Sequence, residues 1–187
     1  MPAVPTLPDR EIWTVEDLDA LPDDGNRYEV LYGELLVTSA PSHRHQNAAT
    51  ALSYLLFDWC RERTGFATLA FGGFHVDRTT FLLPDVALYA MDQHSGVPWP
   101  EVPPPVLAIE VLSPSTRKRD RHRKRPAYLQ HGVRAVWLVD VDHRRVERWH
   151  TGAEFPVIEE ESFRWSPQPD GPPIDIAFDT IFGPAVA

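Results

Sequence analysis

Apolar residues recur at helical spacing within residues 43–63, the most regular segment of the chain. Six of them fall on one side of a helix with 3.6 residues per turn: Ala48, Ala49, Leu52, Leu55, Leu56 and Trp59. Ser42 stands just before this segment, where its hydroxyl can cap the first free N–H groups. A shorter helix is predicted after Thr14, because Asp17 stands three residues later and Pro22 ends the apolar pattern. We therefore expect one long and one short helix in the first third of the chain.

Short apolar or alternating segments predict the β-strands. The predicted strands are two around a turn at Tyr32-Gly33 within residues 27–38, a hairpin of 68–76 with 81–89, buried strands at 106–112 and 135–141, an exposed hairpin partner at 145–150, a weak strand near Val157 and a closing apolar segment at 174–182. The proline-rich residues 92–105 predict a loop, and a helix ended by Gly132 is expected at 121–131. This order indicates an α/β fold with a central mixed β-sheet flanked by helices.

One carboxylate interrupts the apolar strand at 106–112. Glu110 has apolar neighbours on both sides, as in a strand that is buried on both faces. An unpaired charge in such a place costs several kcal/mol or forces the group to become neutral. Glu110 should therefore have a cation beside it, either a metal ion, a lysine or an arginine.

Composition limits the size and the chemistry of the protein. With 187 residues and 43% apolar content, the chain is expected to form a single domain over 1–187, with an N-terminal arm at 1–12. The net charge of -9 argues against a general nucleic-acid coat protein, although seven of the nine residues in 117–125 are Lys or Arg. Cys60 is the single cysteine, and neither a signal peptide nor a membrane-length apolar run is visible, so we expect a cytoplasmic protein that does not enter a membrane.

A second carboxylate, Asp85, follows Pro84 at the start of another apolar segment. If this segment and the Glu110 strand are neighbours, Asp85 and Glu110 can converge at one point on the sheet. Two carboxylates and a backbone carbonyl are the hard oxygen ligands that Mg²⁺ or Mn²⁺ prefers. With a lysine nearby, a water bound to such a metal could be positioned for attack on phosphorus. The chain has two lysines, Lys118 and Lys124.

Several short motifs occur in an order that resembles a known family. They are Arg27-Tyr28-Glu29, Gly33-Glu34-Leu35, residues 41–46 (PSHRHQ), Pro84-Asp85, residues 110–116 (EVLSPST), then Asp120, Lys124 and Tyr128, residues 131–133 (HGV) and 136–140 (VWLVD). Together they resemble the Uma-type "putative restriction endonucleases" of the PD-(D/E)XK nuclease superfamily, over roughly residues 14–182. The resemblance implies a restriction-endonuclease-like fold and metal-dependent hydrolysis of phosphodiester bonds.

The resemblance also implies roles for individual residues. Asp85 and Glu110 would hold the metal, Glu29 would be an auxiliary acidic residue, and Lys124 would be the catalytic lysine. The superfamily's lysine usually stands two residues after the second acid, where this chain has Leu112. Lys124 must therefore reach the site from the following helix. Pro126 stands where a helix-forming residue is expected, so that helix should begin or bend nearby.

DNA is the expected partner, and the basic segment is the expected contact. The residues expected to bind phosphates are Arg117, Arg119, Arg121 and Arg123. His45 is a further candidate for the nucleic-acid-binding site, because it lies in a motif that matches the family. The sequence leaves open whether the protein is a monomer or a homodimer. It also allows this segment to be an ordinary solvated surface.

Each acidic residue has a structural explanation as well. Asp85 can be a turn residue, Glu110 a salt-bridge partner of Arg117 or Lys124, and Glu29 an exposed strand residue. His43 is expected at a helix start, and Tyr128 and Trp137 in the core.

Two other functions fit the same pattern. One is a nucleic-acid-binding module that has the fold without the activity, and the other is a metal-dependent hydrolase of a small phosphate compound. Lys124 distinguishes the binding module from a nuclease, because a binding module does not need an amine beside the carboxylates.

Overall fold

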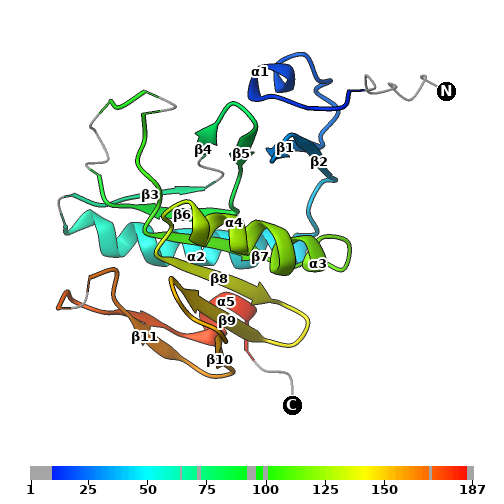
Figure 1. Ribbon diagram of the computed structural model, residues 1–187. Helices are drawn as coiled ribbons and strands as arrows, with labels where there is room; N and C mark the ends of the chain where they lie inside the picture. The colour runs from blue at the N-terminus through cyan, green and yellow to red at the C-terminus, as the bar shows by residue number, and fades with distance from the viewer. Residues whose placement is uncertain are drawn as a thin grey trace.

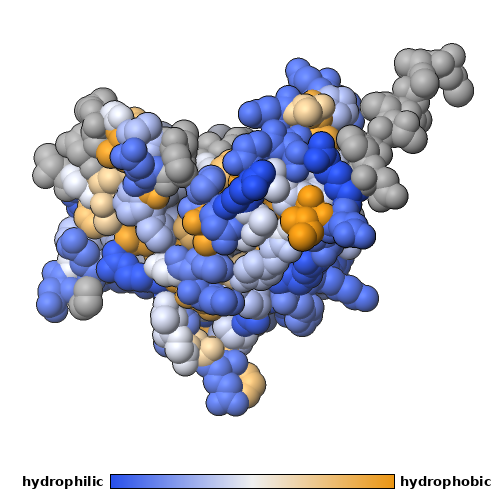
Figure 2. All heavy atoms as spheres, turned by 45° about the horizontal axis from the view of Figure 1, so that its top comes forward, coloured by the Kyte–Doolittle hydropathy of each residue, from blue (hydrophilic) through white to orange (hydrophobic). Residues whose placement is uncertain are grey.

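The computed structural model describes residues 10–63, 65–70, 73–91, 96–98, 101–168 and 170–184 (Figure 1). Most of the expected N-terminal arm and parts of the expected 92–105 loop lie outside these ranges. No helix within them is long and apolar enough to cross a membrane. On the face shown in Figure 2, hydrophilic residues predominate and apolar ones form small separate groups.

A six-stranded sheet forms the centre of the molecule, with strand order β10-β9-β8-β7-β6-β3. Its strands are β3 (Ala67–Ala70), β6 (Val86–Tyr89), β7 (Leu107–Val111), β8 (Ala135–Asp140), β9 (Arg145–His150) and β10 (Val157–Glu159). Only β7 and β8 pair in parallel, so the sheet is mixed as expected. Every residue of β6, β7 and β8 is buried, which explains their nearly continuous apolar sequences.

A second sheet has the order β2-β1-β5-β4, and all its pairs are antiparallel. Its strands are β1 (Arg27–Leu31), β2 (Glu34–Thr38), β4 (Phe74–Asp77) and β5 (Thr80–Leu82). Tyr32 and Gly33 form the predicted turn between β1 and β2, with φ values of 53° and 80°. Positive φ at both central residues is the conformation that two-residue hairpin turns require, which favours glycine at the second position.

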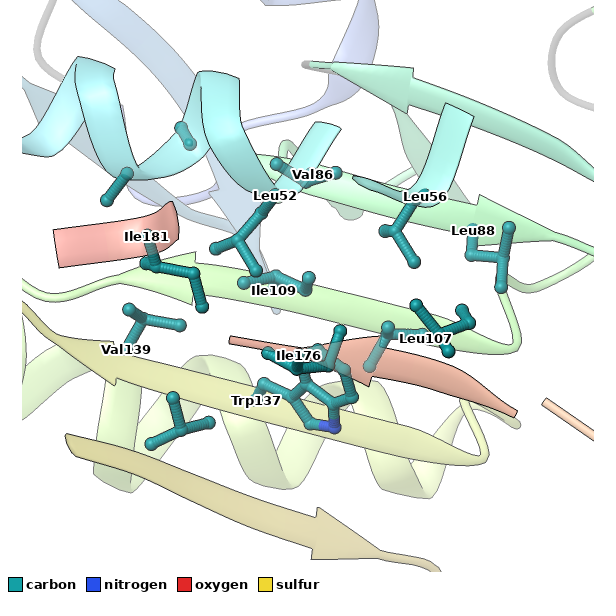
Figure 3. Close-up of a cluster of buried hydrophobic side chains, with 14 of the residues drawn as sticks. Leu52, Leu56, Val86, Leu88, Leu107, Ile109, Trp137, Val139, Ile176 and Ile181 are labelled. Atoms are coloured by element: carbon teal, nitrogen blue, oxygen red, sulfur yellow. The ribbon is translucent and has the colours of Figure 1, made fainter. Parts of the chain in front are cut away.

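The long predicted helix is confirmed as α2 (His43–Arg61), which covers one face of the six-stranded sheet. Ser42 caps its first turn by accepting a hydrogen bond from the His45 N–H group. Side chains from α2 meet the sheet, and α5 (Phe178–Phe182) and β12 (Ile174–Ile176) close the cluster (Figure 3). The strand β12 pairs with β11 (Phe163–Trp165), which the sequence pattern did not predict. The short helix α1 (Val15–Leu18) has the expected capping box between Thr14 and Asp17.

The other face carries a helical segment that connects β7 to β8 (Figure 1). It runs through α3 (Arg117–Arg119), the π-helix η1 (Asp120–Lys124) and α4 (Arg125–Gln130). The predicted start at residue 121 was therefore wrong by four residues. Pro126 lies within the segment and has no N–H group to donate, and the π turn immediately before it lets the chain continue: the Arg125 N–H group bonds to the Asp120 carbonyl.

Two strand predictions need correction. The predicted hairpin of 68–76 with 81–89 is divided between the sheets, because β3 pairs with β6 whereas β4 pairs with β5. The break falls at Pro84, which cannot donate a ladder hydrogen bond and lies between β5 and β6. The strand β9, expected as an exposed partner, lies inside the sheet between β8 and β10 and is half-buried.

Trp137 of β8 links the sheet to the C-terminal segment, since its ring lies 5.2 Å from the rings of both Phe163 and Trp165. We predict that Trp137→Ala lowers the free energy of unfolding by about 3–5 kcal/mol, because it removes a buried ring and leaves a cavity. Urea unfolding followed by circular dichroism measures this change. The control, Phe155→Ala, removes a ring that is 74% exposed and should change stability by less than about 0.5 kcal/mol. Equal effects of the two substitutions would contradict the prediction.

Candidate active site

Asp85 and Glu110 lie on neighbouring strands at the same end of the six-stranded sheet. Asp85 precedes β6, and β6 pairs antiparallel with β7 through Val86 and Ile109. This register brings Asp85 next to Glu110, as the sequence predicted. Both carboxyl groups line one cavity of about 330 Å³. The two residues are only 1% and 2% exposed, so they lie at the bottom of the cavity.

Lys124 is completely buried behind Glu110. Its Nζ atom lies 2.6 Å from Glu110 Oε1 and 2.7 Å from Glu29 Oε1. The predicted ammonium within reach of Glu110 is therefore present, and Glu110 has the cation that its burial requires. Lys118, the other lysine, is exposed. Lys124 itself is not among the residues that line the cavity.

Glu29 and Tyr128 complete the surroundings of this ammonium. Glu29 is completely buried on β1, and its Oε1 also accepts a hydrogen bond of 2.7 Å from the Leu83 N–H group. The interpretation of Glu29 as an exposed strand residue was therefore wrong. The Tyr128 hydroxyl donates a 2.7 Å hydrogen bond to Glu110 Oε1, the same oxygen that Lys124 contacts. Oε1 of Glu110 is thus held from two sides by residues of one helical face.

Asp85 is held by a different set of groups. Arg27 Nη1 lies 2.8 Å from Oδ1, and His45 Nε2 lies 3.1 Å from Oδ2. Oδ2 also accepts a 2.8 Å hydrogen bond from the Val111 N–H group, at the end of the Glu110 strand. Asp85 is therefore no simple turn residue, because it ties β1, α2 and β7 together. His45 takes part in the site, whereas His43 is exposed at the start of α2 as expected.

Burial and charge act in opposite directions on these groups. Burial raises the pKa of the Asp85 carboxyl, but the His45 hydrogen bond and the Arg27 charge outweigh it and lower this pKa to about 2. At Glu110 burial prevails over the attraction of Lys124, so the pKa of this carboxyl is raised, and repulsion from Asp85 adds to the shift. Burial lowers the pKa of Lys124, but the charges of Glu110 and Glu29 outweigh it and raise this pKa above the ordinary lysine value. The amine is therefore an ammonium at neutral pH.

The chemistry of the donors suits a hard divalent cation. Asp85 and Glu110 present carboxylate oxygens to one cavity, as Mg²⁺ and Mn²⁺ prefer. Among the described residues, no group of three or more His, Cys, Asp or Glu side chains is arranged to hold a metal ion. A metal here would therefore be held by the two carboxylates, and water or a main-chain oxygen would fill its remaining coordination positions. It would also have to share Asp85 with Arg27.

Several arginines of the basic segment, which were predicted to bind DNA phosphates, already have partners within the protein. Arg121 donates to Glu147 over 2.7 Å, and Arg123 donates to both carboxylate oxygens of Glu34 over 2.7 and 2.8 Å. Arg119 contacts β2 and lines the cavity, whereas Arg117 is half-buried and shows no ion pair among the described residues. The basic run therefore does not form one continuous surface, because successive side chains on a helix point in different directions.

Three residues of the site were not predicted to have roles there. Arg27 and Asp120 are predicted only as parts of motifs, and Tyr128 as part of a motif and as a core residue. Asp120 is 3% exposed and lines the cavity. Asp120, Lys124 and Tyr128 are spaced four residues apart and are all buried. This spacing places the three side chains on one face of the helical segment, and it is the sequence signal that brings Lys124 toward Glu110.

Comparison with known proteins finds a family model and a solved structure that match this chain. The model of Uma2, described as "Putative restriction endonuclease", matches residues 15–177. A crystal structure of a "putative nuclease belonging to DUF820" from Anabaena variabilis ATCC 29413 superposes with a TM-score of 0.72 and 17% sequence identity. The match covers 90% of this chain and 97% of that chain, which shows that the two share a fold. No match was found among the curated proteins.

The buried charge group predicts a difference between the two lysines. Lys124→Ala should lower the free energy of unfolding by about 3–5 kcal/mol, because it leaves Glu110 and Glu29 buried without their cation. Lys118→Ala removes an exposed ammonium and should change stability by less than about 0.5 kcal/mol. Urea unfolding in a buffer with EDTA measures both values. A small loss at position 124 would show that these carboxyls do not depend on the amine.

Proposed function

Because the chain belongs to the Uma2 family of "putative restriction endonucleases", we propose that it is a nuclease that hydrolyses DNA phosphodiester bonds with Mg²⁺ or Mn²⁺. The observation that carries the proposal is a buried lysine ammonium that contacts Glu110, one of two carboxyl groups that line the same cavity. An inactive binding module would gain nothing from this group, since burying three charges costs free energy.

In this proposal Asp85 and Glu110 hold the metal. When bound, such an ion polarises the phosphate and lowers the pKa of a water molecule. In the hydrolysis that we propose, a water oxygen would form a bond to phosphorus as the P–O ester bond breaks, and the leaving oxygen would take up a proton that the water gives up. No further reactant is needed.

Lys124 acts through Glu110. Its raised pKa keeps it protonated, so it cannot remove a proton from water, and it does not line the cavity. Together with Tyr128 it fixes Oε1 of Glu110, and we propose that this hold orients the carboxylate toward the cavity. Glu29 in turn holds the ammonium. Arg27 and His45 hold Asp85 in the same way.

The first test compares cleavage of supercoiled plasmid and branched DNA with Mg²⁺ or Mn²⁺ and with EDTA. We expect cleavage that EDTA abolishes and that Glu110→Gln lowers at least 100-fold, since a metal ligand contributes several kcal/mol to the transition state. Titration calorimetry of Mn²⁺ should show weaker binding in Glu110→Gln and in Asp85→Asn. The control Asp142→Asn changes a carboxyl that is 45% exposed and should retain both properties. Metal binding that is unchanged in both site variants would refute the assignment.

The second test concerns Lys124. Lys124→Ala should lose hydrolysis but keep Mn²⁺ binding, because the ligands remain while the group that orients Glu110 is gone. Lys124→Arg should not restore activity, since the guanidinium is larger, planar and cannot occupy the space of an ammonium between two carboxylates. Circular dichroism first establishes that each variant is folded at the assay temperature. Full cleavage by a folded Lys124→Ala protein would exclude this role.

A further inference from the structure

The cavity above Asp85 and Glu110 is small for a site that would act on DNA, with a volume of about 330 Å³. Its walls are the segment that follows β2, residues 38–42, and the segment that follows β7, residues 113–116. Its volume is at the lower end of the range for small-molecule sites. A phosphate must enter this space to reach carboxyl groups that are 1% and 2% exposed.

Arg119 connects the two walls of the cavity by hydrogen bonds. Its Nη2 donates a 2.5 Å hydrogen bond to Thr38 Oγ1, and its Nη1 donates a 3.3 Å hydrogen bond to the Val37 carbonyl. Arg119 belongs to the helical segment after β7, whereas Val37 and Thr38 belong to β2. The guanidinium therefore spans the side of the cavity and limits its width.

The charges near the cavity suit a short length of backbone. Duplex DNA carries one negative charge per about 1.7 Å of its axis, so its binding relies on many free cations. Here Arg121 and Arg123 are paired with Glu147 and Glu34. Among the described residues, the guanidinium groups of Arg27 and Arg119 line the cavity, and that of Arg27 is already paired with Asp85. The Arg119 guanidinium donates its hydrogen bonds to an uncharged carbonyl and an uncharged hydroxyl, and its contact with Asp120 is longer, at 3.8 Å, so it can balance one phosphate.

The remaining lining indicates what part of a nucleotide is recognised. Six of the lining residues carry hydroxyls, which can bind sugar and phosphate oxygens: Thr38, Ser39, Ser42, Ser113, Ser115 and Thr116. Among the described residues, no Phe, Tyr or Trp lines the cavity, and these are the rings on which proteins usually stack bases. Recognition would therefore depend on the backbone and little on the base.

We propose that the cavity accepts one nucleotide unit of a single-stranded segment, such as a free end or a flap. A continuous duplex cannot bring its phosphates to the carboxyl groups unless a strand separates from its partner. This inference rests on the proposed nuclease function and specifies its substrate. It also assigns Arg119 the role of limiting access to the site.

The test uses a labelled 20-nucleotide strand, its blunt duplex, and the same duplex with a five-nucleotide single-stranded flap. With Mn²⁺, the single strand and the flap should be cut at least ten times faster than the blunt duplex. Fluorescence anisotropy without metal should show the same order of binding. Strands of different base composition should be cut at similar rates.

Variants of two arginines test the role of Arg119. Arg119→Ala opens the side of the cavity and should reduce the preference for single strands over duplex by at least threefold. Arg164→Ala is the matched control, since Arg164 is 72% exposed and pairs with Asp175, which does not line the cavity. It should leave the preference unchanged.

The outcomes separate the two proposals. Equal cleavage of blunt duplex and single strand would overturn the inference and leave the nuclease function intact. If no DNA is cut, the proposed function fails, and the binding measurement then decides: equal affinity for both forms overturns the inference, and at least tenfold tighter binding of the single strand supports it. If Arg119→Ala leaves the preference for single strands over duplex unchanged, Arg119 does not limit access to the site.

Discussion

The candidate site depends on burying a lysine ammonium between two carboxyl groups. Lys124 is completely buried, and its Nζ atom lies within 2.7 Å of both Glu29 and Glu110. Buried charges are costly unless each has a partner in good geometry, so these three side chains must be placed together or the fold loses stability. The pairing connects β1, β7 and η1, which come from two sheets and a helix. The same contacts that satisfy the charges therefore fix the position of Glu110 at the bottom of the cavity.

The helical segment after β7 makes this arrangement possible. Nuclease sites of the type that the sequence resembles usually carry the lysine on the strand of the second acid, but Leu112 at that position is buried in the apolar core. Here the lysine comes from η1, a π turn before Pro126. The π turn lets the segment continue past the proline while Asp120, Lys124 and Tyr128 stay buried. Tyr128 then contributes a hydroxyl to the same oxygen of Glu110.

The arginines of the basic segment show why residue type alone does not establish a binding surface. On an isolated segment, Arg119, Arg121 and Arg123 are equivalent cations. In the fold, Arg119 spans the cavity wall, Arg121 meets Glu147 of β9, and Arg123 meets Glu34 of β2. The exposed Arg123–Glu34 pair adds little stability, whereas Glu147 is buried, but both pairs neutralise charges that could otherwise bind phosphate. The acidic residues that do this lie far away in the sequence.

The sequence by itself determined the elements whose signals are local. Helical spacing and the Ser42 cap gave α2, the Tyr32-Gly33 turn gave the first hairpin, and continuous apolar runs gave β7 and β8. The requirement that a buried Glu110 have a cation followed from its neighbours alone. Tertiary structure decided everything that depends on distant partners: the division of the 68–89 region between two sheets, the engagement of Arg27 and His45 with Asp85, and the pairing of the arginines. These depend on which strands become neighbours, and contacts between residues 20 to 100 positions apart leave no periodic signal in a single sequence.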